Sequence, residues 1–409
     1  MTRLRRLESW QRTLLIVFIA QLFSATGFSI VFPFLPLYIQ DLGSSTGLST
    51  ELLSGLVISS QAFTMMIAAP IWGALADRYG RKLMVARATF GGSVILLLMA
   101  FVASAEQLVI IRAVQGMITG TVAAANALVA AEAPRDRTGF AMGTVQVGLW
   151  SGISLGPLIG GFLADAFGFR IPFVVTAVLL FISGLLVWFG VREVFEPAVV
   201  VGPDRMGFVQ EWRHVVSLPG VVPTYAVRFL TGMGRNLVTP IMPLFIASLM
   251  SGEVGVSSTT GLITGVASAT GTLGAIVLGR LGDRIGHRDV LIGAALGLTL
   301  CYFPQAFAAT PWQLLILQAL TGFASGGLVS APSAMLAQYT PHGEEGAVYG
   351  LDNSVWAGAR AVAPLAGSSL AVMLGMRSTF VVTALLALVV VMVGVWFVPR
   401  KPARSAAAG

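Results

Sequence analysis

The chain has 409 residues, of which 56% are hydrophobic and only 11% are charged. Soluble domains carry about 25% charged residues, so this composition excludes an ordinary water-soluble fold and indicates that lipid is the solvent. The formal net charge of +7 suggests a nucleic-acid partner, but the placement of the basic residues favours a different explanation.

Twelve apolar stretches are long enough for membrane-spanning helices, which need about 20 residues each. In the first half we expect them near 12–38, 52–75, 84–103, 107–131, 138–164 and 169–191, and in the second half near 219–249, 258–279, 289–308, 311–338, 346–373 and 377–398. The polar segment 192–218 is expected to be a cytoplasmic linker between an N-terminal bundle, 1–191, and a C-terminal bundle, 219–409. The sequence therefore predicts an all-α membrane protein with twelve spans.

The Arg and Lys residues outside the spans lie almost entirely on one side of this topology. With the N-terminus placed in the cytoplasm, nineteen fall in cytoplasmic segments and two, Arg170 and Arg377, on the opposite side. This asymmetry follows the positive-inside rule, explains the basic charge without nucleic acid, and predicts that both termini are cytoplasmic. No small-residue cleavage site follows the first apolar run, which predicts an uncleaved span and not a signal peptide.

Several landmarks occur twice, at a nearly constant offset of about 206 residues. Pro33-Phe34-Leu35-Pro36 returns as Pro240-Ile241-Met242-Pro243, and Gly73-x-x-x-Asp77-Arg78-x-Gly80 returns as Gly279-x-x-x-Asp283-Arg284-x-Gly286. Gly116 corresponds to Gly322, and Pro157 to Pro364. The constant offset predicts two six-helix halves built on one plan, with a polar cavity between them.

The loop between the second and third spans carries an ordered set of small and charged residues: Gly73, Asp77, Arg78, Gly80 and Arg81, with Asp283 and Arg284 at the repeat. Gly73 permits close helix approach, and Gly80 permits a tight reversal. Asp77 can pair with an arginine or face the N-terminus of a neighbouring helix. We expect this set to form a conformational latch. The alternative is a basic loop that only fixes the topology.

The fifth span carries a smooth stripe of small residues: Gly148, Gly152, Gly156, Pro157, Gly160 and Gly161. Glycines that recur every four residues allow close helix contact in lipid, and the proline bends the helix. The eighth span has a similar face in Gly261, Gly265 and Ala269. We expect the fifth and eighth spans to pack together at the interface between the bundles.

Three motifs together resemble the signatures of the major facilitator superfamily. They are the loop motif that begins at Gly73, the Arg112-x-x-Gln115-Gly116 motif of the fourth span, and the glycine motif of the fifth span. The last is similar to the motif of twelve-span drug:proton antiporters. Local strings, among them Phe32 to Tyr38 and Gly161-Phe162-Leu163-Ala164-Asp165, resemble MdtG-type multidrug resistance exporters in particular.

The resemblance implies two six-helix bundles related by a parallel repeat, with drug export driven by proton entry. It also implies that the fifth-span glycines seal the path against leakage. A packing seam without any coupling role is the alternative, and the residues leave it open.

Four arginines lie within spans: Arg112, Arg228, Arg235 and Arg360. Each costs at least a few kcal/mol at the bilayer centre unless it faces a partner or an aqueous space. Arg228 lies near a span end, where we expect it to extend toward the interface or to bind carbonyls. The other three are candidates for a substrate cavity. The excess of positive charge favours an anionic, zwitterionic or neutral amphiphile as substrate over a purely cationic one.

Further cavity candidates are amides and an aromatic residue within spans: Asn126, Gln146, Asn236 and Trp356. An amide in lipid needs a partner, which is the reason for choosing the amides, whereas most aromatic residues face lipid or helix seams. Proton coupling needs a titratable group within the membrane. Asp352 is the first choice and Glu132, at the end of the fourth span, is the second. Arg112 would favour deprotonation of a nearby acid.

These observations predict a secondary active transporter that exports small amphiphilic molecules or drugs across the cytoplasmic (inner) membrane, by proton antiport with alternating access. No GxxxxGK[ST] loop occurs, so ATP-driven pumping by this chain alone is excluded. The three histidines do not cluster, and no metal or cofactor is expected. We expect a monomer that is not an enzyme. An importer or facilitator of a nutrient or metabolite on the same fold is the alternative.

Overall fold

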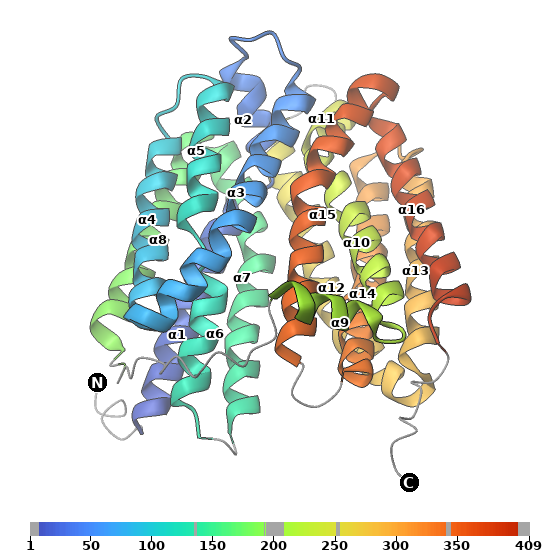
Figure 1. Cartoon of the computed structure of the whole chain (residues 1–409). Coiled ribbons are helices and arrows are strands. Elements are labelled where there is room, and N and C mark those ends of the chain that lie inside the picture. The colour runs from blue at the N-terminus through green and yellow to red at the C-terminus, as the bar shows by residue number, and fades with distance from the viewer. Residues whose placement is uncertain are drawn as a thin grey trace. The chain divides into compact units, whose positions relative to one another are not determined.

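The computed structural model describes residues 8–134, 137–191, 193, 208–250, 254–340 and 345–399. Within these ranges all regular structure is α-helical (Figure 1). The first half contains α1 (Ser9–Ile30), α2 (Leu35–Leu42), α3 (Thr50–Tyr79), α4 (Arg81–Met99), α5 (Ala105–Ile118), α6 (Thr121–Glu132), α7 (Thr138–Phe167) and α8 (Arg170–Gly190). The second half contains α9 (Phe208–Ser217), α10 (Val221–Leu237), α11 (Met242–Met250), α12 (Val256–Ile285), α13 (His287–Gln305), α14 (Pro311–Tyr339), α15 (Glu345–Leu374) and α16 (Met376–Trp396).

Each predicted span coincides with one helix or with two consecutive helices. Ten helical segments within the described residues are long and apolar enough to cross a membrane. The predicted span 107–131 is instead divided between α5 and α6, because Gly120 has φ 148°, a backbone conformation that other residues rarely adopt. The predicted span 289–308 corresponds to α13. The all-α membrane fold expected from the sequence is therefore confirmed.

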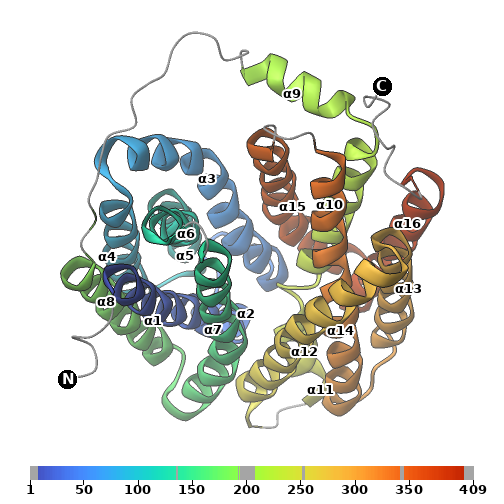
Figure 2. The ribbon, with the colours of Figure 1, turned by 90° about the horizontal axis from the view of Figure 1, so that it is seen from below.

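The chain forms two compact units. Unit 1 comprises Met1–Val200 and Ser251–Gly265. Within it α5 and α6 lie among α1, α3, α4 and α7, as the view along the helices shows (Figure 2). Its apolar core has two parts. One gathers around Phe34, Tyr38 and Phe173, and the other around Val17, Leu128 and Val187. Burial of these side chains stabilises the packing of the broken α5–α6 pair.

Unit 2 comprises Val201–Met250 and Val266–Gly409. Here α10 packs against α15 and α16, and α13 packs against α14 and α16. The short helix α9 joins this unit through Val215, which is buried with Val221, Tyr225 and Leu336. The paired helices α10 and α15 carry most of the charged residues within the predicted spans of this half.

The internal repeat predicted from the sequence is confirmed by equivalent contacts in the two units. A Cβ on Gly116 would lie 2.1 Å from the Gln61 carbonyl oxygen, and a Cβ on Gly322 would lie 2.1 Å from that of Ala267. Tyr38 contacts Phe173 in unit 1 as Phe245 contacts Phe380 in unit 2.

Two turn glycines repeat in the same way. Gly80 has φ 96° and Gly286 has φ 102°, and each ends one long helix and begins the next. A positive φ at both positions explains why the sequence repeats glycine there. The two halves therefore share their helix–helix contacts as well as their order of elements.

The glycine stripe of α7 packs mainly against α1, whereas the sequence suggested α12 as its partner. A Cβ on Gly152 would lie 2.7 Å from the Leu22 carbonyl oxygen, and a Cβ on Gly160 would lie 1.9 Å from that of Ile30. The stripe predicts a close neighbour but does not identify which helix it is.

Contact between α7 and the first turns of α12 is confirmed within unit 1, but it uses a different face of α7. A Cβ on Gly161 would meet the Ser257 carbonyl oxygen at 2.2 Å, and a Cβ on Gly261 would meet that of Pro157 at 2.2 Å. The Asp165 carboxylate also accepts hydrogen bonds from the backbone N–H groups of Ser257 and Ser258, at 3.2 and 2.6 Å. An anion at a helix N-terminus is favourable, so Asp165 helps to fix this contact.

Candidate functional site

A buried ion pair joins α10 to α15 in unit 2. Nε of Arg228 donates to Oδ1 and Oδ2 of Asp352, at 2.9 and 3.2 Å, and Nη2 donates to Oδ2 at 2.9 Å. The side chain of Asp352 is 5% exposed and that of Arg228 is 14% exposed. A guanidinium that binds a carboxylate through two nitrogens makes strong, directional hydrogen bonds. Arg228 therefore does not extend to the interface. It binds a carbonyl oxygen, as the second expectation had it, and it also neutralises the acid predicted to couple protons.

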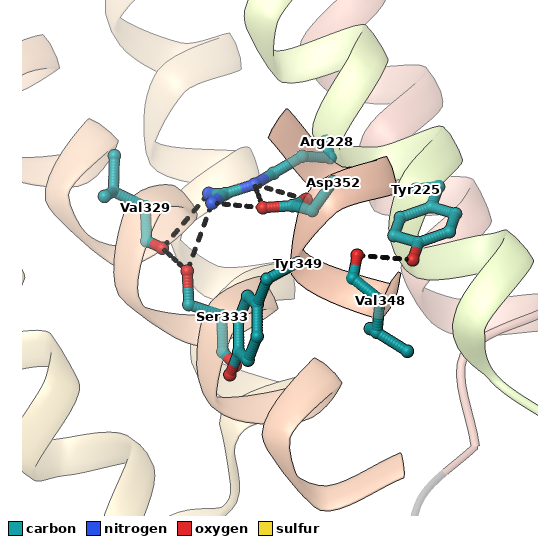
Figure 3. A network of polar contacts seen from close by, with 7 residues as sticks. All are labelled: Tyr225, Arg228, Val329, Ser333, Val348, Tyr349 and Asp352. Atoms are coloured by element: carbon teal, nitrogen blue, oxygen red, sulfur yellow. Dashed lines mark hydrogen bonds and ion pairs between the residues drawn. The ribbon is translucent and has the colours of Figure 1, made fainter. Parts of the chain in front are cut away.

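The remaining donors of Arg228 bind α14 (Figure 3). Nη1 donates to the Val329 carbonyl oxygen at 3.3 Å, and Nη2 donates to the Ser333 hydroxyl at 3.1 Å. One turn before Arg228, the Tyr225 hydroxyl donates to the Val348 carbonyl oxygen at 2.8 Å, one turn before Asp352. The ion pair is thus part of a network that joins three helices of unit 2.

The local sequence explains why α10 and α15 come so close. Gly232 has no side chain, and a Cβ there would lie 2.8 Å from the Ala359 Cβ and 3.1 Å from the Trp356 ring. Two small residues at the crossing let the backbones approach. Trp356 also lies near the Arg228 guanidinium, 5.6 Å from its carbon to the ring centroid. Asp352, Trp356 and Arg360 recur every four residues and so share one face of α15.

Arg112 has a different environment in unit 1. Its Nη1 donates to the side-chain oxygens of Gln61, at 2.9 Å, and Gln115, at 3.0 Å. The residue is 3% exposed, and its Nε is buried without a hydrogen-bond partner among the described residues. Arg112 is therefore held by amide oxygens, and no ion pair to it occurs in the part of the chain that the structure describes.

Arg235, on α10, and Arg360, on α15, lie within unit 2 near the crossing of these helices. Protein atoms surround both guanidinium groups, yet both side chains keep an exposed surface. The two charges lie close enough to repel each other, and Arg235 also interacts electrostatically with Tyr302 on α13. The structure thus brings two of the predicted cavity arginines together, whereas Arg112 belongs to the other unit.

The predicted amides have local roles where their contacts are described. Asn236 donates to the Gly232 carbonyl oxygen of its own helix at 2.8 Å. Asn126 has a buried side-chain oxygen without a partner among the described residues. Gln146 is half-buried on α7. Glu132, the second candidate for proton coupling, has a buried Oε1 that also lacks a partner among the described residues. None of these four residues belongs to the Arg228–Asp352 network.

The loop residues predicted to form a latch are described in part. The side chain of Asp77 lies outside the described residues. Arg78 lies beside the Tyr79 ring, and Arg81 donates to the Ala127 carbonyl oxygen at 3.2 Å. In the repeat, an Oδ1 of Asp283 lies 3.4 Å from Nε2 of His287. Gly73 and Arg284 are exposed, and a Cβ at position 73 would meet nothing within 4 Å.

The sequence did not indicate that Glu193 belongs to the loop region between α3 and α4. Its carboxylate accepts hydrogen bonds from the backbone N–H groups of Arg81, at 2.9 Å, and Lys82, at 2.8 Å. It therefore caps α4, where Gly80 offers no side chain to do so. Nothing in the local sequence marks Glu193, because it lies 112 residues from Arg81 along the chain and reaches the start of α4 only through tertiary packing.

The partner of Asp352 was also missed, although the sequence held a signal for it. At the offset of about 207 residues that relates this part of the two halves, Arg228 corresponds to Gln21 and Asp352 to Val145. Opposite charges that appear together in only one half of a repeat are candidates for an ion pair, since each is costly alone in a membrane. This comparison would have indicated an ion pair for Asp352, but it does not choose between Arg228 and Arg360, because Arg360 corresponds to the uncharged Ile153.

Comparison with known proteins agrees with the fold and the repeat. The sequence model of the Major Facilitator Superfamily matches residues 17–226 and again residues 224–409. The chain therefore belongs to the major facilitator superfamily and is a membrane transporter. This finding confirms the family resemblance drawn from the sequence motifs.

Similar curated proteins include the multidrug resistance protein MdtG of Dickeya zeae (strain Ech586). It is 37% identical over 379 residues, which is 92% of this chain and 91% of that protein. The MdtG protein of Yersinia enterocolitica serotype O:8 is 33% identical over 405 residues, 99% of this chain and 97% of that protein. The predicted similarity to MdtG-type proteins is thus confirmed over nearly the whole chain.

Solved structures agree at the level of the fold. The nucleoside transporter NupG has a TM-score of 0.80 at 12% identity, over 95% of this chain and all of that chain. A D-xylose–proton symporter has a TM-score of 0.76 at 16% identity, over 97% of this chain and 100% of the other. At such identities the likeness concerns the helical architecture alone.

Proposed function

We propose that this transporter exports small amphiphilic molecules, including drugs, across the cytoplasmic membrane in exchange for protons, by alternating access. The extensive similarity to proteins named for multidrug resistance supports the export of drugs. The buried Arg228–Asp352 pair is the observation that supports proton coupling, because Asp352 is a carboxyl group within a predicted membrane span. The excess of arginines within the spans supports an anionic, zwitterionic or neutral substrate.

In this proposal Asp352 binds and releases the transported proton. A proton that enters from outside adds to one carboxylate oxygen and removes the negative charge that binds Arg228. The guanidinium then keeps the weaker bonds to Val329 and Ser333, so the hold of α10 on α15 loosens. When the proton leaves to the cytoplasm, the ion pair forms again. Glu132 remains the second candidate, because its unpartnered oxygen is also buried.

We also propose roles for the loops and helices around the Arg228–Asp352 pair. The loop after α3 and its repeat after α12 act as latches on the cytoplasmic side, where both termini also lie. The α7 glycines serve as a tight seam, in agreement with the close approach of α7 to α1. The protein functions as a monomer, and no cofactor takes part.

The decisive experiment compares proton-driven transport with exchange in proteoliposomes. We expect Asp352→Asn to reduce gradient-driven uptake at least about tenfold while substrate-for-substrate exchange persists, since only the proton-binding group is lost. Asp41→Asn, at an exposed acid of α2, is the matched control and should behave like the wild type. Full gradient-driven uptake by Asp352→Asn would remove Asp352 from the coupling role, and transport in the direction of import would favour a nutrient transporter.

A further inference from the structure

Within the predicted spans of unit 2, two arginine side chains have no described hydrogen-bond or ion-pair partner. Arg228 binds Asp352, Arg288 donates to carbonyl oxygens at the end of α16, and Arg377 donates to the Ala308 carbonyl oxygen. The side chains of Arg235 and Arg360 make no hydrogen bond and no ion pair with any residue that the structure describes. Both keep an exposed side-chain surface.

The two residues lie near the same helix crossing. They flank the close crossing of α10 and α15, where Gly232 meets Ala359 and Trp356. Like charges near one crossing repel each other. The neighbouring acid, Asp352, is already neutralised by Arg228, so the described part of this region carries two uncompensated positive charges.

Two unpaired cations in the middle of membrane-spanning helices are costly, and such residues mark ligand sites. Planar guanidinium groups match the oxygens of carboxylate, sulfonate or phosphate groups, because each fork can donate two parallel hydrogen bonds. Trp356, one turn before Arg360 on the same face of α15, offers an apolar surface beside them. An anionic amphiphile consists of an anionic head group, which suits the two arginines, and an apolar body, which suits Trp356.

We propose that Arg235 and Arg360 together bind the anionic group of the transported molecule, with its apolar body against Trp356. The pair is then the specificity-determining site of unit 2 and is separate from the Arg228–Asp352 pair. This inference rests on the proposed export function, since it assigns the site to that function's substrate. It narrows the substrate to amphiphiles that carry an acidic group.

The test compares two probes of equal size that differ in one charge. Purified protein in lipid nanodiscs is titrated with radiolabelled naphthalene-1-sulfonate and with naphthalene-1-sulfonamide. The wild type should bind the sulfonate at least about tenfold more tightly. Arg235→Gln and Arg360→Gln should each weaken sulfonate binding by about tenfold and leave sulfonamide binding unchanged.

Two further variants distinguish a loss of the binding site from a loss of the folded structure. Arg235→Lys keeps the charge and should retain part of the preference for the sulfonate. Arg280→Gln removes an exposed arginine of α12 and should bind both probes like the wild type. Equal binding of the two probes by the wild type would overturn the inference, and so would variants that lose both probes in parallel.

Transport measurements distinguish a failure of the arginine site from a failure of the proposed export function. If the wild type moves the sulfonamide under a proton gradient but shows no preference for the sulfonate, export stands and the arginine site fails. If sulfonate binding depends on both arginines but no gradient drives either probe, the site stands and proton-coupled export fails.

Discussion

At the scale of single residues, Arg228 and Asp352 stabilise unit 2 only as a pair. Each charge alone would be buried without compensation, and breaking a buried pair by removing one partner costs about 3–5 kcal/mol. The pair also joins α10 to α15 and α14. The free energy lost when this buried pair is broken is therefore larger than for exposed ion pairs, which contribute little.

We predict that Arg228→Gln lowers the stability of the protein by about 3 kcal/mol, because it leaves the Asp352 carboxylate buried and unpaired. The double variant Arg228→Gln with Asp352→Asn should recover most of this loss, since two neutral amides can hydrogen-bond to each other. Thermal unfolding in detergent measures both effects. Additive losses in the double variant would show that the two residues act independently.

A second residue-scale prediction concerns Glu106, ahead of the predicted span 107–131. One carboxylate oxygen accepts hydrogen bonds from the hydroxyls of Ser44 and Thr46, each at 2.9 Å. Hydrogen bonds from its own backbone N–H, and then from Ser44 and Thr46, lower the pKa of Glu106. Because the folded-state pKa is lowered, this stabilisation is present above the ordinary value of 4.5 and is lost only as the pH falls through the lowered pKa.

We therefore expect the loop before α3 to stay ordered as the pH is lowered through 4.5 and to loosen only in stronger acid. A spin label at Leu48→Cys, with Cys301 replaced by serine, reports the loop's mobility. Glu106→Gln should be mobile even at neutral pH, whereas Glu51→Gln, in the first turn of α3, is the control and should not be. Loosening of the unsubstituted loop near pH 4.5 would contradict this account.

At the scale of elements, the close approach of two helices decides which glycines contribute to stability. Of the α7 glycines, Gly160 lies against the α1 backbone, whereas a Cβ on Gly143 would meet nothing within 4 Å. Both occupy the same helix, so their intrinsic helix propensities are equal. Any difference in stability between substitutions at the two positions therefore reflects packing and not local conformation.

Gly160→Ala should destabilise the protein by about 1–3 kcal/mol, because its Cβ would lie 1.9 Å from the Ile30 carbonyl oxygen and the helices must separate. Gly143→Ala should be neutral or slightly stabilising, since alanine favours the helix. Chemical denaturation in mild detergent provides the comparison. Equal stability of the two variants would mean that the α1–α7 contact contributes nothing measurable.

At the scale of the whole molecule, the distribution of basic residues sets the orientation in the membrane. The single cysteine, Cys301, makes a cysteine-free background simple to prepare. In that background Ser45→Cys should react with a membrane-impermeant maleimide added from the outside. Arg284→Cys, also exposed, should react only in inverted vesicles. The reverse labelling would place the termini outside the cytoplasm.

Much of the fold could be predicted from the sequence because lipid imposes simple rules. Spans must be long and apolar, and a repeated order of residues implies a repeated order of helices. Gly80 and Gly286 were recognisable as turns, and both have the positive φ that requires glycine. The break at Gly120 was not foreseen, since apolar residues continue on both sides of it.

The sequence by itself determined the class of protein and the number and order of its spans. Only the tertiary structure decided the partners: Arg228 for Asp352, Glu193 for the start of α4, and α1 for the α7 stripe. The physical reason is that hydrophobicity and helical period act along the chain. A hydrogen bond or a close helix crossing instead depends on which residues, far apart in sequence, the packing brings within about 3 Å.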